Sequence, residues 1–155
     1  MFNKNTNVKD EIIVYSTKKE LKKILNFIYN GLKDYNPSKD FKFKLSLVIE
    51  EIFINIVTHG YKNVEDNKVK TFYVIEEDPL AITVGFIDNG ILFNPVRYMD
   101  NLDLYIDVIG SDYEKSSFGI ILIKNNVDKI HYRTDGDRNI LIFKKYFNNN
   151  DDSMV

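Results

Sequence analysis

The sequence predicts an α+β protein, a two-layer sandwich in which a mixed, mainly antiparallel sheet carries helices on one face. Five segments are rich in β-branched and aromatic residues, and four of them form pairs joined by short turns. Two further segments place apolar residues at helical spacing. The 155 residues are 44% hydrophobic, enough for a core, and show no internal linker or repeat. We therefore expect a single domain over 1–155, with its core at about 11–146.

The first half of the chain predicts one strand and two helices. Residues 11–16 are an apolar run flanked by polar residues, which favours a strand. Apolar residues at helical spacing follow between 21 and 32, and the turn at 36–40 offers Ser38 as a helix cap. The clearest helical pattern covers about 40–61, where Leu45, Val48, Ile49, Ile52, Phe53, Ile56 and Val57 form one broad apolar stripe.

The second half predicts two hairpins separated by a long irregular stretch. The segments 68–77 and 80–88 flank Asp78-Pro79, and 128–134 and 139–147 flank a second turn at 135–137. Between the hairpins, 89–118 is rich in turn residues and acidic, with one amphipathic stretch near 102–109, and a short buried helix is expected from Phe118. A structureless stretch of this length is more often a functional lid than scaffolding. We place the lid at about 96–117 and a flexible tail at 148–155.

Composition excludes several classes of function. The net charge is −2, which lacks the basic face that nucleic-acid binding requires. The chain has no cysteine, so a disulfide framework, a cysteine nucleophile and a Cys-type zinc site are excluded. No apolar run reaches the length of a membrane span, and the first ten residues do not resemble a signal peptide. We expect a soluble cytoplasmic protein that binds neither nucleic acid nor membrane.

Polar side chains on the long helix are the first candidates for chemistry. Glu51, Asn55 and His59 share one edge of its apolar stripe. One interpretation is a solvated flank of the helix. The alternative is a carboxylate that acts as a base beside an amide oxygen for a hard cation such as Mg²⁺. The spacing leaves both open.

Two turns offer further candidates. Asp88-Asn89-Gly90 comes at the end of a predicted strand, and one interpretation is a tight turn. The alternative is that Asp88 accepts a hydrogen bond from a ligand amine, while Gly90 allows a flat ring to approach the backbone. Ser116-Ser117-Phe118-Gly119 is expected to open the short helix, and the free N–H groups of a helix start can bind phosphate. Most helix starts bind none, so this signal alone is weak.

Together, three stretches resemble the GHKL (histidine-kinase-like) ATPase superfamily, in the form found in anti-sigma-factor serine/threonine kinases. LSLVIEEIFINIVTHGY (45–61) resembles the N box and VGFIDNGILFNP (84–95) the G1 box, while 118–145 is similar to the G2 region and the closing strands. The order and spacing match over about 11–146. This resemblance implies a GHKL-like sandwich that binds ATP and Mg²⁺ beneath a mobile lid.

The resemblance also implies roles for individual residues. Glu51 matches the general base, Asn55 the Mg²⁺-binding amide, and Asp88 the adenine-reading carboxylate. The remaining expected nucleotide contacts are Gly90, Ser117, Phe118, Gly119, Ile120 and Asn139.

In function, the resemblance implies an ATP-dependent serine/threonine kinase that holds a sigma factor inactive and phosphorylates a STAS-domain anti-anti-sigma protein. Homodimers are common in that family, but the sequence locates no interface. One departure concerns Ser116 and Ser117, which stand where relatives usually have two glycines. The alternative function is therefore a catalytically weak or inactive nucleotide-binding module that regulates a partner by sequestering it.

Overall fold

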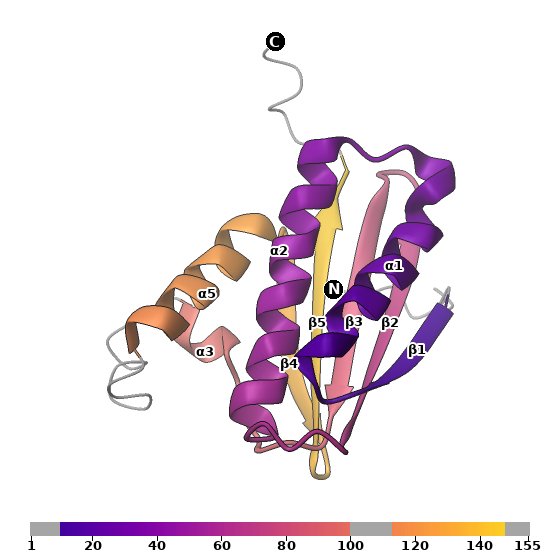
Figure 1. Ribbon diagram of the computed structural model, residues 1–155. Coiled ribbons are helices and arrows are strands. Elements are labelled where there is room, and N and C mark those ends of the chain that lie inside the picture. The colour runs from indigo at the N-terminus through magenta and orange to yellow at the C-terminus, as the bar shows by residue number, and fades with distance from the viewer. Residues whose placement is uncertain (1–9, 100–112, 148–155) are drawn as a thin grey trace.

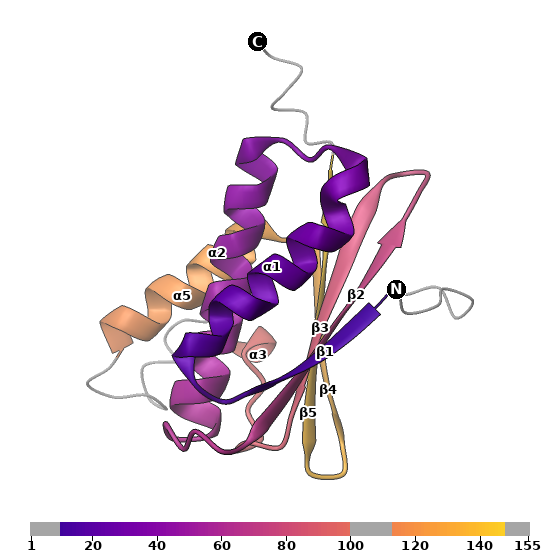
Figure 2. The same ribbon diagram turned by 45° about the vertical axis from the view of Figure 1, so that its right-hand side comes forward.

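The computed structural model describes residues 10–99 and 113–147, and for 113–117 it describes only the helical backbone. Helices α1 and α2 lie across one face of a sheet, and α5 lies beside α2 (Figures 1 and 2). The strands are β1 (Asp10–Tyr15), β2 (Lys68–Glu76), β3 (Ala81–Asp88), β4 (Lys129–Asp135) and β5 (Arg138–Tyr146). The α-helices are α1 (Leu21–Leu32), α2 (Lys39–Asn55), α3 (Val96–Met99) and α5 (Tyr113–Asn126). Short 3₁₀ turns, η1 (Lys18–Glu20) and η2 (Lys33–Tyr35), precede and follow α1.

The five described strands form one sheet in the order β1-β2-β3-β5-β4. All four pairings among them are antiparallel, so within the described residues the sheet is purely antiparallel and not mixed. The two predicted hairpins are confirmed as β2–β3 and β4–β5. Strand β5 pairs with β3 as well as with β4, and this places Asp88 directly opposite Asn139.

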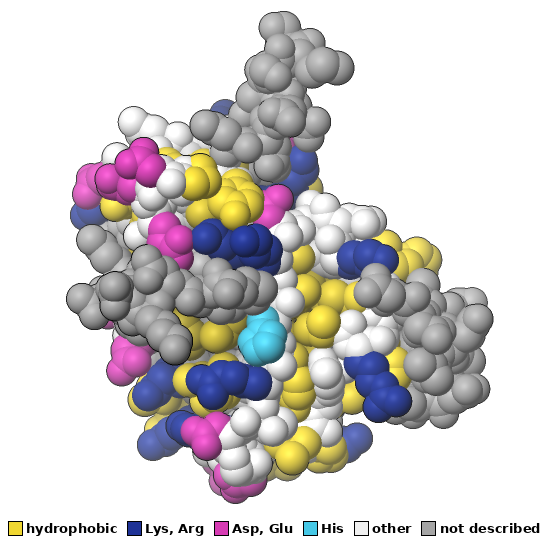
Figure 3. All heavy atoms as spheres, turned by 180° about the vertical axis from the view of Figure 1, so that it is seen from behind, with side chains coloured by type: hydrophobic (Ala, Val, Ile, Leu, Met, Phe, Trp, Pro, Cys, Tyr) yellow, Lys and Arg dark blue, Asp and Glu magenta, His cyan; other side chains and the backbone are white. Residues whose placement is uncertain are grey.

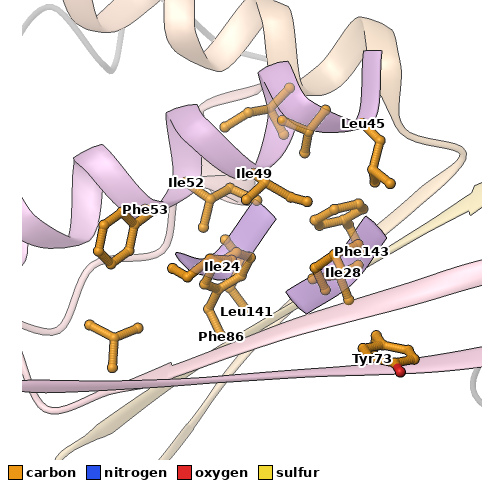
Figure 4. Close-up of a cluster of buried hydrophobic side chains, with 14 of the residues drawn as sticks. Ile24, Ile28, Leu45, Ile49, Ile52, Phe53, Tyr73, Phe86, Leu141 and Phe143 are labelled. Atoms are coloured by element: carbon orange, nitrogen blue, oxygen red, sulfur yellow. The ribbon is translucent and has the colours of Figure 1, made fainter. Parts of the chain in front are cut away.

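The core lies between the sheet and the apolar stripe of α2 (Figure 4). The stripe residues Leu45, Val48, Ile49, Ile52 and Phe53 are each at most 2% exposed. They pack with Ile24 and Ile28 of α1 and with Phe86 and Phe143 of the sheet. Burying a side chain of this size contributes about 1.5–3 kcal/mol. The helical periodicity therefore predicted the buried face of α2 correctly.

The two ends of α2 differ from each other. At the start, the Ser38 hydroxyl accepts a hydrogen bond from the N–H of Phe41 at 3.0 Å, which confirms the predicted cap. At the end, the helix widens after Asn55 into a π-helical turn, η3 (Ile56–Gly60), closed by a bond from the Tyr61 N–H to the Ile56 carbonyl. Such turns are rare and are frequent at functional sites.

Helix α5 begins earlier than the sequence predicted. Its backbone is helical from Tyr113, so Ser116 to Gly119 lie within it and do not open it. The N–H groups that have no partner inside a helix lie in its first turn, so they come before Ser117, Phe118 and Gly119. The predicted lid overlaps α3 and the first turn of α5, while the predicted amphipathic stretch near 102–109 lies outside the described residues.

The other face of the sheet carries no described helix (Figures 1 and 2). Apolar side chains run along it between lysine and arginine side chains (Figure 3). Val74 and Ile140 lie on this face, and both are buried although they do not belong to the helix-facing core. Of the helices that the structure describes, none has the length and apolar character needed to cross a membrane.

Candidate functional site: a carboxylate pair between α2, α5 and the end of β3

Helix α2 presents Glu51 and Asn55, one turn apart, at the edge of its buried face. Both side chains are partly buried. Among the described residues, the Glu51 carboxylate makes no hydrogen bond or ion pair, and neither does the Asn55 amide. Burial raises the pKa of the Glu51 carboxyl above its ordinary value, and the neighbouring Glu50 raises it further. A carboxylate that is desolvated and not neutralised by a cation is suited to accept a proton.

Gly119 on α5 lies against this carboxylate. A Cβ atom added at Gly119 would come closer than 3.0 Å to Oε2 of Glu51, so the end of the Glu51 side chain fills the space beside Gly119 and would have to rotate away from a side chain at this position. The far end of α5 is fixed by Lys145 of β5, whose buried ammonium donates to the Asn126 carbonyl at 2.9 Å. A cation is favourable at a helix C-terminus. The structure thus holds α5 beside the Glu51 carboxylate.

The second carboxylate is Asp88, at the end of β3 and only 5% exposed. Its Oδ1 accepts a hydrogen bond from the Gly90 N–H at 2.9 Å and one from the Asn139 amide at 3.1 Å. Burial raises the pKa of Asp88, and the two hydrogen bonds lower it in part. No hydrogen bond between Oδ2 and the described residues is found, so this oxygen remains available to a donor.

The loop after Asp88 packs against the π-helical turn of η3. The Ile91 N–H donates to the Gly60 carbonyl at 3.0 Å, and the Asn89 N–H donates to the Tyr61 hydroxyl at 2.7 Å. That hydroxyl in turn donates to the Lys68 carbonyl at 2.8 Å. The loop that follows the carboxylate is therefore held by hydrogen bonds to Gly60 of η3 and to Tyr61, and this segment continues directly from the helix that carries Glu51 and Asn55.

Gly90 is required by this packing, and we expect Gly90→Ala to lower the free energy of unfolding by about 1–3 kcal/mol. A Cβ atom at Gly90 would lie 2.7–2.9 Å from the backbone of Gly60, which cannot rotate away as a side chain could. Gly60→Ala is the matched control, since its Cβ would meet only ordinary contacts of 3.8–4.0 Å. Urea unfolding of both variants without nucleotide measures the difference, and equal losses would contradict the packing described here.

The structure brings most of the predicted site residues into two groups. Glu51 of α2 and Gly119 of α5 meet, with Asn55 one turn further along α2, while Asp88, Gly90 and Asn139 lie at the ends of β3 and β5. The side chain of Ile120 is buried in the core, and that of Phe118 is 71% exposed. The side chain of Ser117 lies outside the described residues.

Asn139 was expected to be a nucleotide ligand, and in the structure the protein itself uses both ends of its amide. The oxygen Oδ1 accepts from the Phe93 N–H and the Tyr132 hydroxyl, and Nδ2 donates to Asp88. The tyrosines at 61 and 132 were missed by the sequence analysis. Tyr61 ends the stretch 45–61 and Tyr132 lies within 118–145, but neither was singled out as a site residue, and only the inward position of Tyr132 on β4 could have suggested its role.

The site also fits a divalent cation held largely by a ligand. In the parts of the chain that the structure describes, no three His, Cys, Asp or Glu side chains gather into a metal site. Mg²⁺ usually takes one or two protein oxygens together with phosphates and water, and the oxygen of the Asn55 amide can serve as one of them.

The family to which the chain belongs follows from comparison with known proteins. The model of the histidine kinase-like ATPase domain matches residues 14–145. This range includes both carboxylates and the helices and strands that position them.

Curated relatives are more distant. The chain is 26% identical over 117 residues to an anti-sigma F factor of Clostridium beijerinckii, an alignment that covers 73% of this chain and 76% of that protein. It is 28% identical over 107 residues to the serine-protein kinase RsbW of Listeria monocytogenes, covering 67% of this chain and 65% of that one.

A solved structure agrees with the fold. The RsbU and RsbW domains of a Mycobacterium tuberculosis protein superpose with a TM-score of 0.58 at 11% identity, over 88% of this chain and 32% of that chain. At this identity the likeness concerns the fold alone. Because the family model matches residues 14–145, most of the chain, the chain belongs to the histidine kinase-like ATPase domain family.

Proposed function

We propose that this chain is an ATP-dependent serine/threonine protein kinase that acts as an anti-sigma factor in the cytoplasm. It would bind a sigma factor and hold it inactive. It would also phosphorylate a STAS-domain protein that opposes this inhibition of the sigma factor. The observation that carries this proposal is the half-buried Glu51 carboxylate, which has no described cation beside it and lies one helical turn from Asn55 and against α5. The similarity to an anti-sigma F factor and to the serine-protein kinase RsbW supports the choice of partners and acceptor.

In the proposed mechanism, the protein acts by positioning and by proton transfer. The free oxygen of Asp88 accepts a hydrogen bond from the exocyclic amine of adenine, while the Gly90 N–H holds the other oxygen of the same carboxylate. Asn55 provides an oxygen to Mg²⁺, which neutralises charge on the phosphates when it is bound. Glu51 accepts the proton of the attacking serine or threonine hydroxyl. The N–H groups in the first turn of α5, which begins at Tyr113, provide donors for phosphate oxygens.

Two measurements test this function. Thermal unfolding with Mg-ATP should show a gain in stability, about 2.7 kcal/mol when the ligand is at about 100 times its dissociation constant. Incubation with labelled ATP, Mg²⁺ and STAS-domain proteins from the same genome should then label one of them on serine or threonine, and EDTA should abolish the labelling. Absence of both the stabilisation and the labelling would contradict the proposal.

A second candidate function is regulation by sequestration without phosphoryl transfer. Ser116 and Ser117, which stand where the resembled family usually has two glycines, favour this function. The backbone of α5 is helical through both residues, so they do not form a glycine turn that could clasp the phosphates. In this case Mg-ATP or Mg-ADP stabilises the protein, the sigma factor is bound, and no STAS-domain protein is labelled.

A further inference from the structure

The Asn139 amide lies at the centre of the hydrogen bonds around the Asp88 carboxylate. Asn139 is 6% exposed and stands opposite Asp88 in the pairing of β3 with β5. Its Nδ2 lies 3.1 Å from Oδ1 of Asp88, 3.2 Å from the Gly90 carbonyl and 3.3 Å from the Ile91 carbonyl. Three acceptors thus surround the two N–H bonds of one amide nitrogen.

The opposite end of the amide faces donors only. Its Oδ1 accepts from the Phe93 N–H at 3.2 Å and from the Tyr132 hydroxyl at 2.5 Å. These two donors fix the orientation of the amide, since a flipped amide would turn its carbonyl oxygen toward the Asp88 carboxylate. Both lone pairs and both N–H bonds of Asn139 are therefore used within the protein.

This arrangement decides what Asp88 can offer to a ligand. Oδ1 is occupied by the Gly90 N–H and the Asn139 amide, so the available oxygen is Oδ2. An ionised carboxylate accepts hydrogen bonds and cannot donate them, and its orientation is set by the donors on its other oxygen. A purine that carries an amine at position 6 satisfies Oδ2, whereas a purine with a carbonyl at this position is repelled.

We propose that Asn139 and Tyr132 form a positioning pair that aims the Asp88 carboxylate at the 6-amino group of the nucleotide, and that Asn139 itself does not contact the nucleotide. This inference rests on the proposed function, because it assumes that the nucleobase lies at Asp88. Tyr132 acts through Asn139, since its hydroxyl holds the amide oxygen away from the carboxylate. The pair therefore determines selectivity for adenine, not merely the stability of the loop.

The sharpest test is Asn139→Asp, which has nearly the same shape. The new carboxyl keeps an acceptor for Tyr132 and Phe93, but it places an oxygen in front of Asp88 and of the Gly90 carbonyl. At pH 8 the two carboxylates repel each other, and we expect Mg-ADP to bind about 10- to 100-fold more weakly than to wild type. At lower pH the pair shares one proton, which restores a donor between the two side chains, so the ratio of dissociation constants falls toward one.

The ratio to wild type at each pH removes the contribution of the other ionisable side chains around the pair. The phenols of Tyr61 and Tyr132 have pKa values raised by burial and stay neutral in this range. Asp137, bonded to Asn89 in the neighbouring turn, and His59 of η3 are present in both proteins. Protonation of the nucleotide phosphates also cancels in the ratio.

Tyr132→Phe tests the second member of the pair while leaving the ring in place. We expect about 3- to 10-fold weaker binding of Mg-ATP. The affinity for purine riboside triphosphate, which lacks the 6-amino group, should change less than twofold. Tyr29→Phe is the matched control, since it also removes a hydroxyl that donates to a carbonyl, that of Lys42 at 3.2 Å, between α1 and α2.

The outcomes separate this inference from the proposed function. If the wild type binds neither Mg-ATP nor Mg-ADP, the proposed function itself is wrong. If the wild type binds, but Asn139→Asp shows the same affinity and pH dependence, the positioning role is overturned. Equal weakening of ATP and of the analogue in Tyr132→Phe also overturns it, because the effect would then not act through the amine. Should Asn139→Asp fail to fold at pH 8, Tyr132→Phe decides the question.

Discussion

Replacing Glu51 by glutamine is expected to lower phosphoryl transfer by about 10²–10⁴-fold, the range that general-base help usually contributes. Glutamine has the same size and keeps the contact with Gly119, but it cannot accept the proton of the attacking hydroxyl. The affinity for Mg-ATP should stay within about twofold to threefold of the wild type. Single-turnover phosphorylation of the STAS-domain acceptor and calorimetric titration with Mg-ATP measure the two quantities separately. A parallel loss of binding and transfer would contradict the role as a base.

The adjacent Glu50 supplies a matched control for this experiment. Its negative charge helps to raise the pKa of Glu51, after burial, which is the larger cause. Glu51 must be ionised to accept a proton, so the wild-type rate should fall as the pH falls through this raised pKa. In Glu50→Gln the rate at neutral pH should be nearly unchanged, and the acidic limb should move to lower pH. An acidic limb that stays in place would show that another group controls it.

Replacing Asp88 by asparagine should weaken nucleotide binding by about 100-fold or more without weakening the fold. The oxygen of the new amide can still accept from Gly90 and Asn139, while its nitrogen presents N–H groups where the 6-amino group requires an acceptor. Calorimetric titration with Mg-ADP measures the loss. Asp137→Asn, a neutralised carboxylate in the neighbouring turn, is the control and should bind normally.

The stability of the same variant has an expected sign. The pKa of Asp88 is higher in the folded protein than in the unfolded chain, so the folded state binds the proton more tightly. The buried carboxylate therefore destabilises the fold above the folded pKa, and this cost disappears as the pH falls toward the unfolded value. Without nucleotide at pH 7, Asp88→Asn should unfold at the same or a higher urea concentration than wild type. A lower midpoint would show that the carboxylate stabilises the loop after all.

The sequence predicted those features that depend on short-range patterns. The spacing of Ile49, Ile52 and Phe53 along α2 gave its buried face, and the turn residues at 78–79 and 135–137 gave both hairpins. Glu51 and Asn55 were candidates because one helix carries both, and a helix determines the relation between residues four apart. The contact of Glu51 with Gly119 could be expected only from the resemblance to a family, not from periodicity.

Other features depend on contacts between distant parts of the chain. Asp88 and Asn139 are 51 residues apart, and their hydrogen bond exists because β5 returns to pair with β3. A local reading of Asn139 cannot show that its amide is used on both ends. The start of α5 at Tyr113 and the π-helical turn of η3 were missed for a related reason, since serines and Thr-His-Gly have no strong helical preference and packing decides their conformation.

The contact between Gly119 and Glu51 also limits how the protein can change in evolution. An alanine at 119 would displace only the end of the Glu51 side chain, which can rotate, so the fold should tolerate it while the carboxylate turns away from its present position. If Glu51 is the base, as proposed, this substitution should cost phosphoryl transfer more than stability. A descendant that no longer needs the carboxylate in that orientation is therefore the one in which this glycine is free to drift.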